Sequence, residues 1–186
     1  MKAFRYILPF VLVSAALGQT AAAHRSNTQI INFVLDLQEK RILAAAEAMP
    51  EDKFGFTPNA GEFNGVRSFA EQLKHIAADN YLLGAGILGE KPPGDTGPGE
   101  KGSSSVRRKS EIIAYVKDSF AYMHRAADVI DDANVPIPTP GISPWPKGTA
   151  TRLGVAIEDC VHTWDHYGQI VEYLRMNGII PPASRK

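Results

Sequence analysis

Residues 155–178, VAIEDCVHTWDHYGQIVEYLRMNG, form the stretch that decides the fold of this chain. The stretch contains no proline, and Thr149 and Thr151 ahead of it can each cap the start of a helix. Its Asn-Gly end at 177–178 is typical of a left-handed C-cap, and the proline pair at 181–182 prevents the helix from resuming. We therefore predict one long helix that begins near one of these threonines and ends just before the Asn-Gly pair.

Three earlier segments carry apolar residues at the same helical spacing. We predict helices over residues 26–48, 66–88 and 106–131. On the first of them we expect an inward-facing stripe made of Ile30, Phe33, Val34, Leu37, Arg41 and Ala44. No sustained two-residue alternation of the kind that predicts a strand occurs outside the N-terminal leader.

The connections between these segments are rich in proline, glycine and serine. Residues 89–105, GEKPPGDTGPGEKGSSS, offer nothing apolar to bury, and we expect them to be exposed and mobile. A long crossing connection of this kind suits a bundle whose helices do not simply alternate up and down. Four amphipathic helices joined by polar loops predict an all-α fold, a four-helix bundle.

The N-terminal residues MKAFRYILPFVLVSAALGQTAAAH have the features of a cleavable signal peptide. Lys2 and Arg5 supply positive charge, residues 7–17 form a short apolar core, and the alanines at 21–23 fit a cleavage site. The core is too short for a permanent membrane helix, which needs about 20 apolar residues. We expect a signal peptide over residues 1–23, with an uncleaved N-terminal anchor as the alternative.

Cleavage would leave residues 24–186, a suitable length for one domain with its own core. The mature protein would be periplasmic or secreted and would keep no stable membrane anchor.

Charge and cysteine content limit the classes of partner and of stabilising bond. The 20 Lys+Arg balance the 20 Asp+Glu, and loss of the leader would leave 18 against 20, a net charge of −2. No basic stripe is visible, so we expect no nucleic acid partner. Cys160 is the only cysteine, which excludes an internal disulfide. We interpret it as a small buried hydrophobic residue, with a third metal ligand or a reactive thiol as the less favoured alternatives.

His162 and His166 lie four residues apart in the last predicted helix, so their imidazoles leave the same face, with Cβ atoms roughly 5–6 Å apart. Two such imidazoles can bind one metal ion, although two solvated histidines would show the same spacing. His75, in the predicted helix 66–88, can join them only if the two helices are neighbours, which spacing does not show. Three imidazoles would leave an open coordination position, as in catalytic zinc sites.

The pair lacks the glutamate base of the zinc metalloproteases. The residue after His162 is Thr163, so the HExxH pattern is absent and peptide hydrolysis by that route is not expected.

Three features together resemble the DinB/YfiT-like superfamily, a group of bacterial proteins regarded as metalloenzymes. The first is residues 49–83, MPEDKFGFTPNAGEFNGVRSFAEQLKHIAADNYLL, in which a Phe-rich loop leads into a helix with one histidine. The second is the ending HTWDHYGQIVEYLRMNGIIPPASR at residues 162–185, and the third is the layout of four helices with a long middle connection. The likeness covers the chain from about residue 27 to its end.

This resemblance implies a DinB-like four-helix bundle with an unusual helix order, a possible homodimer, and a divalent metal ion, zinc or nickel. The ligands implied are His75, His162 and His166, with water completing the coordination sphere. Metal-bound water can lose a proton near neutral pH and attack a carbonyl or phosphoryl centre; alternatively, the ion can bind a substrate thiolate.

No protein side chain can be named as catalytic beyond that water. Asp79 follows His75 by one turn, and we expect it either to accept a hydrogen bond from an imidazole of the centre or to face solvent. The resemblance thus predicts an exported metal-dependent hydrolase or transferase for an unknown small molecule. A non-enzymatic, metal-stabilised bundle that binds a small ligand or is purely structural is the alternative.

Overall fold

The computed structural model describes residues 25–62, 64–139 and 148–185, and this part of the chain is all-helical. Its four long helices are α1 (Asn27–Ala48), α2 (Phe69–Leu88), α3 (Lys109–Asp128) and α4 (Arg152–Met176). Short 3-10 turns lie at Glu51–Lys53, Pro98–Glu100 and Pro182–Ser184. The prediction of a four-helix bundle is confirmed, and the predicted signal peptide lies outside the described residues.

Local sequence signals set the helix starts. Ser26 and Ser68 each form a capping box with the residue three positions on, Gln29 and Glu71, and Thr151 accepts the backbone N–H of Gly154. The cap at position 68 explains why α2 begins three residues later than the apolar pattern predicts.

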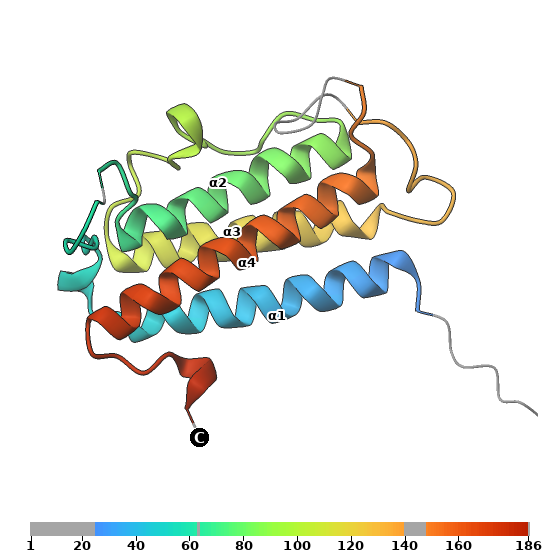
Figure 1. Cartoon of the computed structure of the whole chain (residues 1–186). Coiled ribbons are helices and arrows are strands. Elements are labelled where there is room, and N and C mark those ends of the chain that lie inside the picture. The colour runs from blue at the N-terminus through green and yellow to red at the C-terminus, as the bar shows by residue number, and fades with distance from the viewer. Residues whose placement is uncertain (1–24, 63, 140–147, 186) are drawn as a thin grey trace, which may run out of the picture.

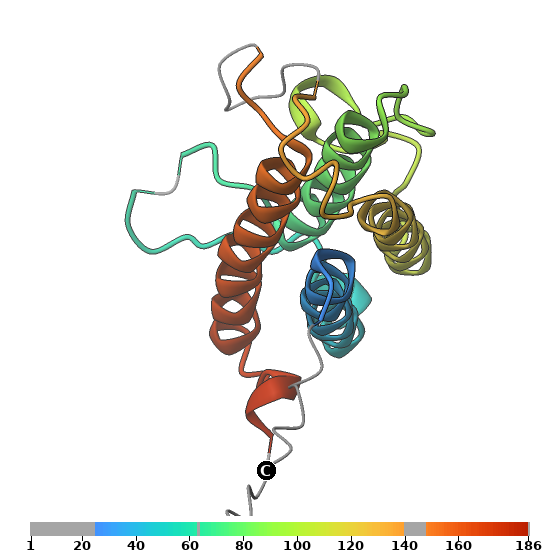
Figure 2. The ribbon, with the colours of Figure 1, turned by 90° about the vertical axis from the view of Figure 1, so that its right-hand side faces the viewer.

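The helices are arranged so that α1 lies diagonally across the bundle from α2, and α3 lies diagonally across from α4. The α2 helix packs between α3 and α4, and α1 packs on the opposite side between the same two helices (Figure 2). The α2 and α3 helices run in one direction and α1 and α4 in the other (Figure 1). Because α2 and α3 are parallel, the chain between them must return along the whole bundle, and it does so over the outer side of α2 (Figure 1).

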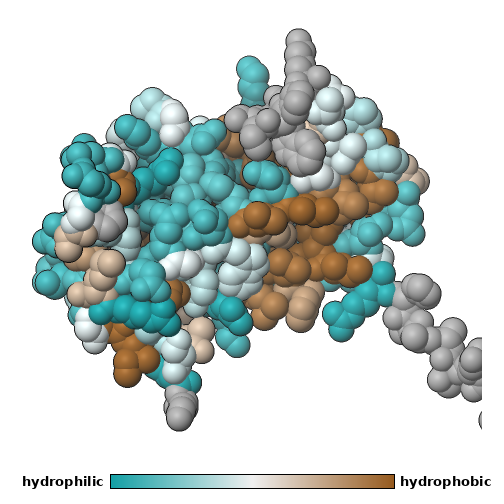
Figure 3. Space-filling model, in the orientation of Figure 1, coloured by the Kyte–Doolittle hydropathy of each residue, from teal (hydrophilic) through white to brown (hydrophobic). Residues whose placement is uncertain are grey.

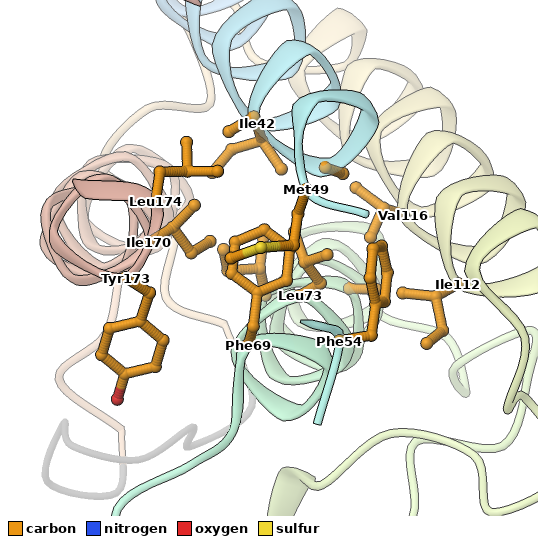
Figure 4. Packing of buried hydrophobic residues seen from close by; sticks show 14 of the residues in the cluster. Ile42, Met49, Phe54, Phe69, Leu73, Ile112, Val116, Ile170, Tyr173 and Leu174 are labelled. Carbon is orange, nitrogen blue, oxygen red and sulfur yellow. The ribbon is translucent and has the colours of Figure 1, made fainter. Parts of the chain in front are cut away.

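Two apolar clusters fill the ends of the bundle. Phe69, Leu73 and Ile170 belong to the cluster formed where α1 and α4 end and α2 and α3 begin (Figure 4). Leu35, Ile87 and Met123 belong to the cluster at the opposite end. Between the two lies a layer of buried polar side chains, namely Gln38, Asn80, Ser119, Asp159 and Thr163.

Hydrogen bonds from this polar layer join all four helices. With its amide nitrogen turned toward α4, Asn80 donates to Asp159 Oδ1 at 3.1 Å, and its oxygen accepts from Ser119 Oγ at 3.1 Å. Gln38 of α1 donates to the carbonyl of Cys160 at 2.6 Å.

The predicted inner stripe of the first helix is wrong by about one residue. The buried face of α1 carries Ile31, Leu35, Gln38, Ile42, Ala45 and Ala46. Ile30 and Phe33 are instead 50% and 51% exposed. Both stripes are apolar at helical spacing, so the choice between them depends on where α3 and α4 lie rather than on α1 itself. The exposed apolar residues in the N-terminal halves of α1 and α4, with Ile157 and Val161 among them, form an apolar surface (Figure 3).

The expectation that residues 89–105 are an exposed, mobile linker is also wrong in part. Tyr115 donates to the carbonyl of Asp95 at 2.9 Å, and the N–H of Gly102 donates to the carbonyl of Thr96 at 2.8 Å. Ser103 is buried. Polar and glycine-rich sequence does not prevent a loop from being fixed when its backbone groups bond to one another and to a neighbouring helix.

Among the described residues, none of the helices has the length and apolar content that a membrane crossing requires.

Candidate metal centre

The bundle brings His75 of α2 together with His162 and His166 of α4, because these two helices are antiparallel neighbours. The Nε2 atom of His162 lies 3.2 Å from Nε2 of His75 and 2.9 Å from Nε2 of His166. The three rings meet edge to face, with centroids 4.3–4.9 Å apart. The residue that spacing alone could not connect to the pair therefore lies in contact with it.

The spacing of these nitrogens fits a single metal ion. Metal–nitrogen bonds are about 2.0–2.1 Å, so two nitrogens on one ion lie about 2.9 Å apart at a right angle and about 3.3 Å apart at a tetrahedral angle. The observed 2.9 Å and 3.2 Å fall at these values.

Each imidazole is also oriented by a contact at its other ring nitrogen, because its Nδ1 atom faces an oxygen acceptor. His75 Nδ1 lies 2.7 Å from the carbonyl oxygen of Glu100, and His162 Nδ1 lies 3.1 Å from Asp79 Oδ2. His166 Nδ1 lies 2.5 Å from Gln72 Oε1. An Nδ1–H that donates to oxygen leaves the Nε2 lone pair free, which is the tautomer that a metal ion binds through Nε2.

Burial keeps these imidazoles in the neutral form that binds metal. Desolvation first, and then the neighbouring imidazoles, lower the pKa of His166 to about 3. The same causes lower the pKa of His162 to about 4, and desolvation also lowers the pKa of His75. Near pH 7 the lone pairs are therefore available without loss of a proton.

Asp79 contacts two imidazoles of the centre. Its Oδ2 atom faces His162 Nδ1 and also lies 3.3 Å from His75 Nε2. Burial first, and then the carboxylates of Glu100 and Asp159, raise the pKa of Asp79 to about 8. Both partners thus favour their neutral forms, and the contacts are hydrogen bonds rather than an ion pair. A cation at the centre would favour the ionised carboxyl instead.

The centre opens to solvent on the side of His162. The side chain of His162 is 26% exposed, whereas that of His75 is 5% exposed. A ligand could therefore approach without displacing the packed core.

Two residues of the centre were missed by the sequence analysis. Gln72 lies three residues before His75, so its place on the same face of α2 was readable, but its partner His166 was not. Glu100 lies in the connection that was expected to be mobile, and the glycines around it are its only sequence signal. Cys160, by contrast, takes no part in the centre; it packs half-buried against the second apolar cluster, where burial raises its pKa to about 12.

The fold and the centre define a class of protein, a four-helix bundle with a candidate three-histidine metal site between α2 and α4. A family model of the DinB superfamily matches residues 35–170, and the chain belongs to this superfamily.

A solved structure is similar in fold. It is described as the crystal structure of the conserved protein of locus from Enterococcus faecalis. The likeness has a TM-score of 0.65 at 18% identity and covers 82% of this chain and 98% of that chain. No curated protein matches the sequence.

Proposed function

We propose that this protein binds one divalent metal ion, zinc or nickel, through Nε2 of His75, His162 and His166. One observation carries the proposal: Nε2 of His162 lies at ligand spacing from Nε2 of both other histidines, while every Nδ1 faces its own oxygen acceptor. Surface histidines that meet by chance have no reason to be fixed in one tautomer by three separate acceptors.

The side chains around the centre have distinct tasks in this proposal. Asp79 and Gln72 hold the rings of His162 and His166, and the carbonyl of Glu100 holds the ring of His75. A divalent ion in such a site supplies Lewis acidity, which polarises a bound carbonyl or phosphoryl group and activates water or a thiol. The partly exposed His162 leaves one side of the centre accessible to a small molecule.

These features support a metal-dependent hydrolase or transferase acting on a small molecule, in which the fourth position receives substrate or water. The N-terminal sequence supports export to the periplasm or beyond. Cytosolic low-molecular-weight thiols are scarce there, so a hydrolase is the preferred form of the proposal. Dimer formation stays a prediction, which light scattering coupled to gel filtration would test.

Metal analysis of protein purified without a His-tag tests the binding proposal. We expect close to one ion per chain in wild type and a large loss in His162→Ala. The matched control is His124→Ala, because His124 lies on α3 and contacts Asn32 of α1, away from the centre. Metal-free wild-type protein from a metal-replete medium would contradict the proposal.

The alternative is a bundle in which the ion only holds α2 against α4. Turnover of ester and phosphate substrates that is lost on chelation and restored by added metal would exclude it. Chelation that lowers the melting temperature, with no turnover across the panel, would instead favour it.

A further inference from the structure

The connection between α2 and α3 is held tightly against the N-terminal half of α2. A Cβ atom built on Gly102 would lie 2.8 Å from the carbonyl oxygen of Lys74, the residue before His75. A Cβ atom on Gly97 would lie 2.2 Å from the carbonyl oxygen of Gly102. Glycine is therefore needed at both positions for the backbone to approach this closely, and residues 97–102 are fixed beside His75.

Glu100 lies within this segment in an unusual backbone conformation. Its φ angle is 60°, the only positive φ among the described non-glycine residues. Left-handed backbone is unfavourable for a residue with a side chain. The conformation directs the Glu100 carbonyl oxygen at His75 Nδ1, where it lies 2.7 Å away.

The carboxylate of Glu100 lies near His75 and Asp79. One of its oxygens, a ring nitrogen of His75 and a carboxylate oxygen of Asp79 all lie within 4.8 Å of one another. Asp79 Oδ2 is itself 3.3 Å from His75 Nε2, so the Glu100 carboxylate lies on the side of the centre formed by His75 and Asp79. The Glu100 side chain is exposed, and its carboxylate makes no hydrogen bond or ion pair with any residue that the structure describes.

We propose that Glu100 is a fourth protein ligand of the metal ion, so that the centre binds through three imidazole nitrogens and one carboxylate oxygen. The inference rests on the proposed function and adds a residue that lies outside the helices. Two ligands on opposite sides of one ion are about 4.2 Å apart. A Glu100 carboxylate oxygen lies within 4.8 Å of a ring nitrogen of His75, and rotation of this exposed side chain can bring it closer.

Charge favours the same arrangement. Three neutral imidazoles bring no negative charge to the ion, whereas a carboxylate ligand brings one directly to the metal. A carboxylate oxygen also suits harder divalent ions better than a fourth imidazole or a thiolate would. Because Glu100 is exposed, a substrate can displace it without disturbing the packing of α2 and α4.

Cobalt(II) binding tests this proposal without an activity assay. The affinity of tag-free protein for Co²⁺ is measured by competition with a chromophoric chelator, and the visible spectrum of the bound ion is recorded. We expect Glu100→Gln to lower the affinity by about 10–100-fold, the range for loss of a residue that supports a metal site, and to change the spectrum. Glu172→Gln is the control, because Glu172 lies exposed on α4 and bonds to Arg175.

The possible outcomes separate this inference from the binding proposal. Wild-type affinity, within about twofold, in Glu100→Gln would overturn the inference, and so would a lower affinity with an unchanged cobalt spectrum. Either result, together with loss of binding in His162→Ala, would leave the three-histidine proposal intact. A wild-type protein that binds no cobalt would overturn both.

Discussion

Gln72 provides a direct way to test whether the acceptors behind the imidazoles support metal binding. Its Oε1 atom lies 2.5 Å from His166 Nδ1, and its Nε2 atom donates to Gln169 Oε1 at 2.7 Å. Gln72→Met keeps a similar side-chain volume but removes both partners. The His166 Nδ1–H then lies buried without an acceptor, at a cost of about 1–3 kcal/mol in unfolding free energy.

The same substitution should weaken metal binding. Loss of an acceptor behind a metal-bound imidazole lowers affinity by about 10–100-fold, which corresponds to about 1.4–2.8 kcal/mol. Competition with a chromophoric chelator measures the affinity. Urea denaturation with chelator measures the loss of stability in the metal-free protein, and denaturation without chelator adds the effect of weaker metal binding. The matched control is Gln169→Met, which removes the bond to Gln72 but touches none of the three imidazoles.

Affinity within about threefold of wild type in Gln72→Met, in a folded protein, would refute the reasoning. It would mean that the ring of His166 needs no acceptor at Nδ1, and that the hydrogen bonds around the centre are ordinary core contacts.

Four further predictions follow from burial, close contact and charge. Phe69→Ala should lower the free energy of unfolding by about 3–5 kcal/mol in urea denaturation, because the ring is fully buried in the first apolar cluster. Gly102→Ala should displace the loop from α2, because the φ angle of Gly102 is 72° and a Cβ atom there would lie 2.8 Å from a carbonyl oxygen. We expect lower metal affinity and a free energy of unfolding that is lower by at least about 1 kcal/mol. In metal-free protein, burial raises the pKa of Asp159 from 3.8 to about 7. The stability contributed by the protonated carboxyl is therefore present below pH 4 and is lost as pH rises to 7. Wild type should lose stability relative to Asp159→Asn over that range, and parallel pH profiles of the two proteins would contradict this prediction. The lowered pKa of His166 has the reverse sign, so the metal-free wild type should lose stability relative to His166→Asn as pH falls from about 6.5 toward 4, measured by urea denaturation in chelator.

The parts of the fold that depend on local sequence signals were predictable. Prolines, glycines and capping residues set the helix ends to within about three residues, because each acts on the backbone next to it. The face of α1 was not predictable, because Ile30 and Phe33 compete with Ile31 and Leu35 as apolar stripes. Only the positions of α3 and α4 decide which stripe is buried.

The candidate site also has a part that local sequence predicts and a part that depends on how the helices pack. The spacing of His162 and His166 placed both imidazoles on one helix face, and the resemblance to a known family added His75. That α2 and α4 are neighbours is a property of the diagonal arrangement and has no local signal. Glu100 reaches the centre because two parallel helices require a long returning connection, which composition alone led us to interpret as mobile.

Anomalous diffraction from crystals of zinc- or nickel-loaded protein tests the central claim most directly. The account predicts one peak per chain, about 2.0–2.1 Å from Nε2 of His75, His162 and His166. A loaded protein whose peak lies away from these three atoms would contradict it.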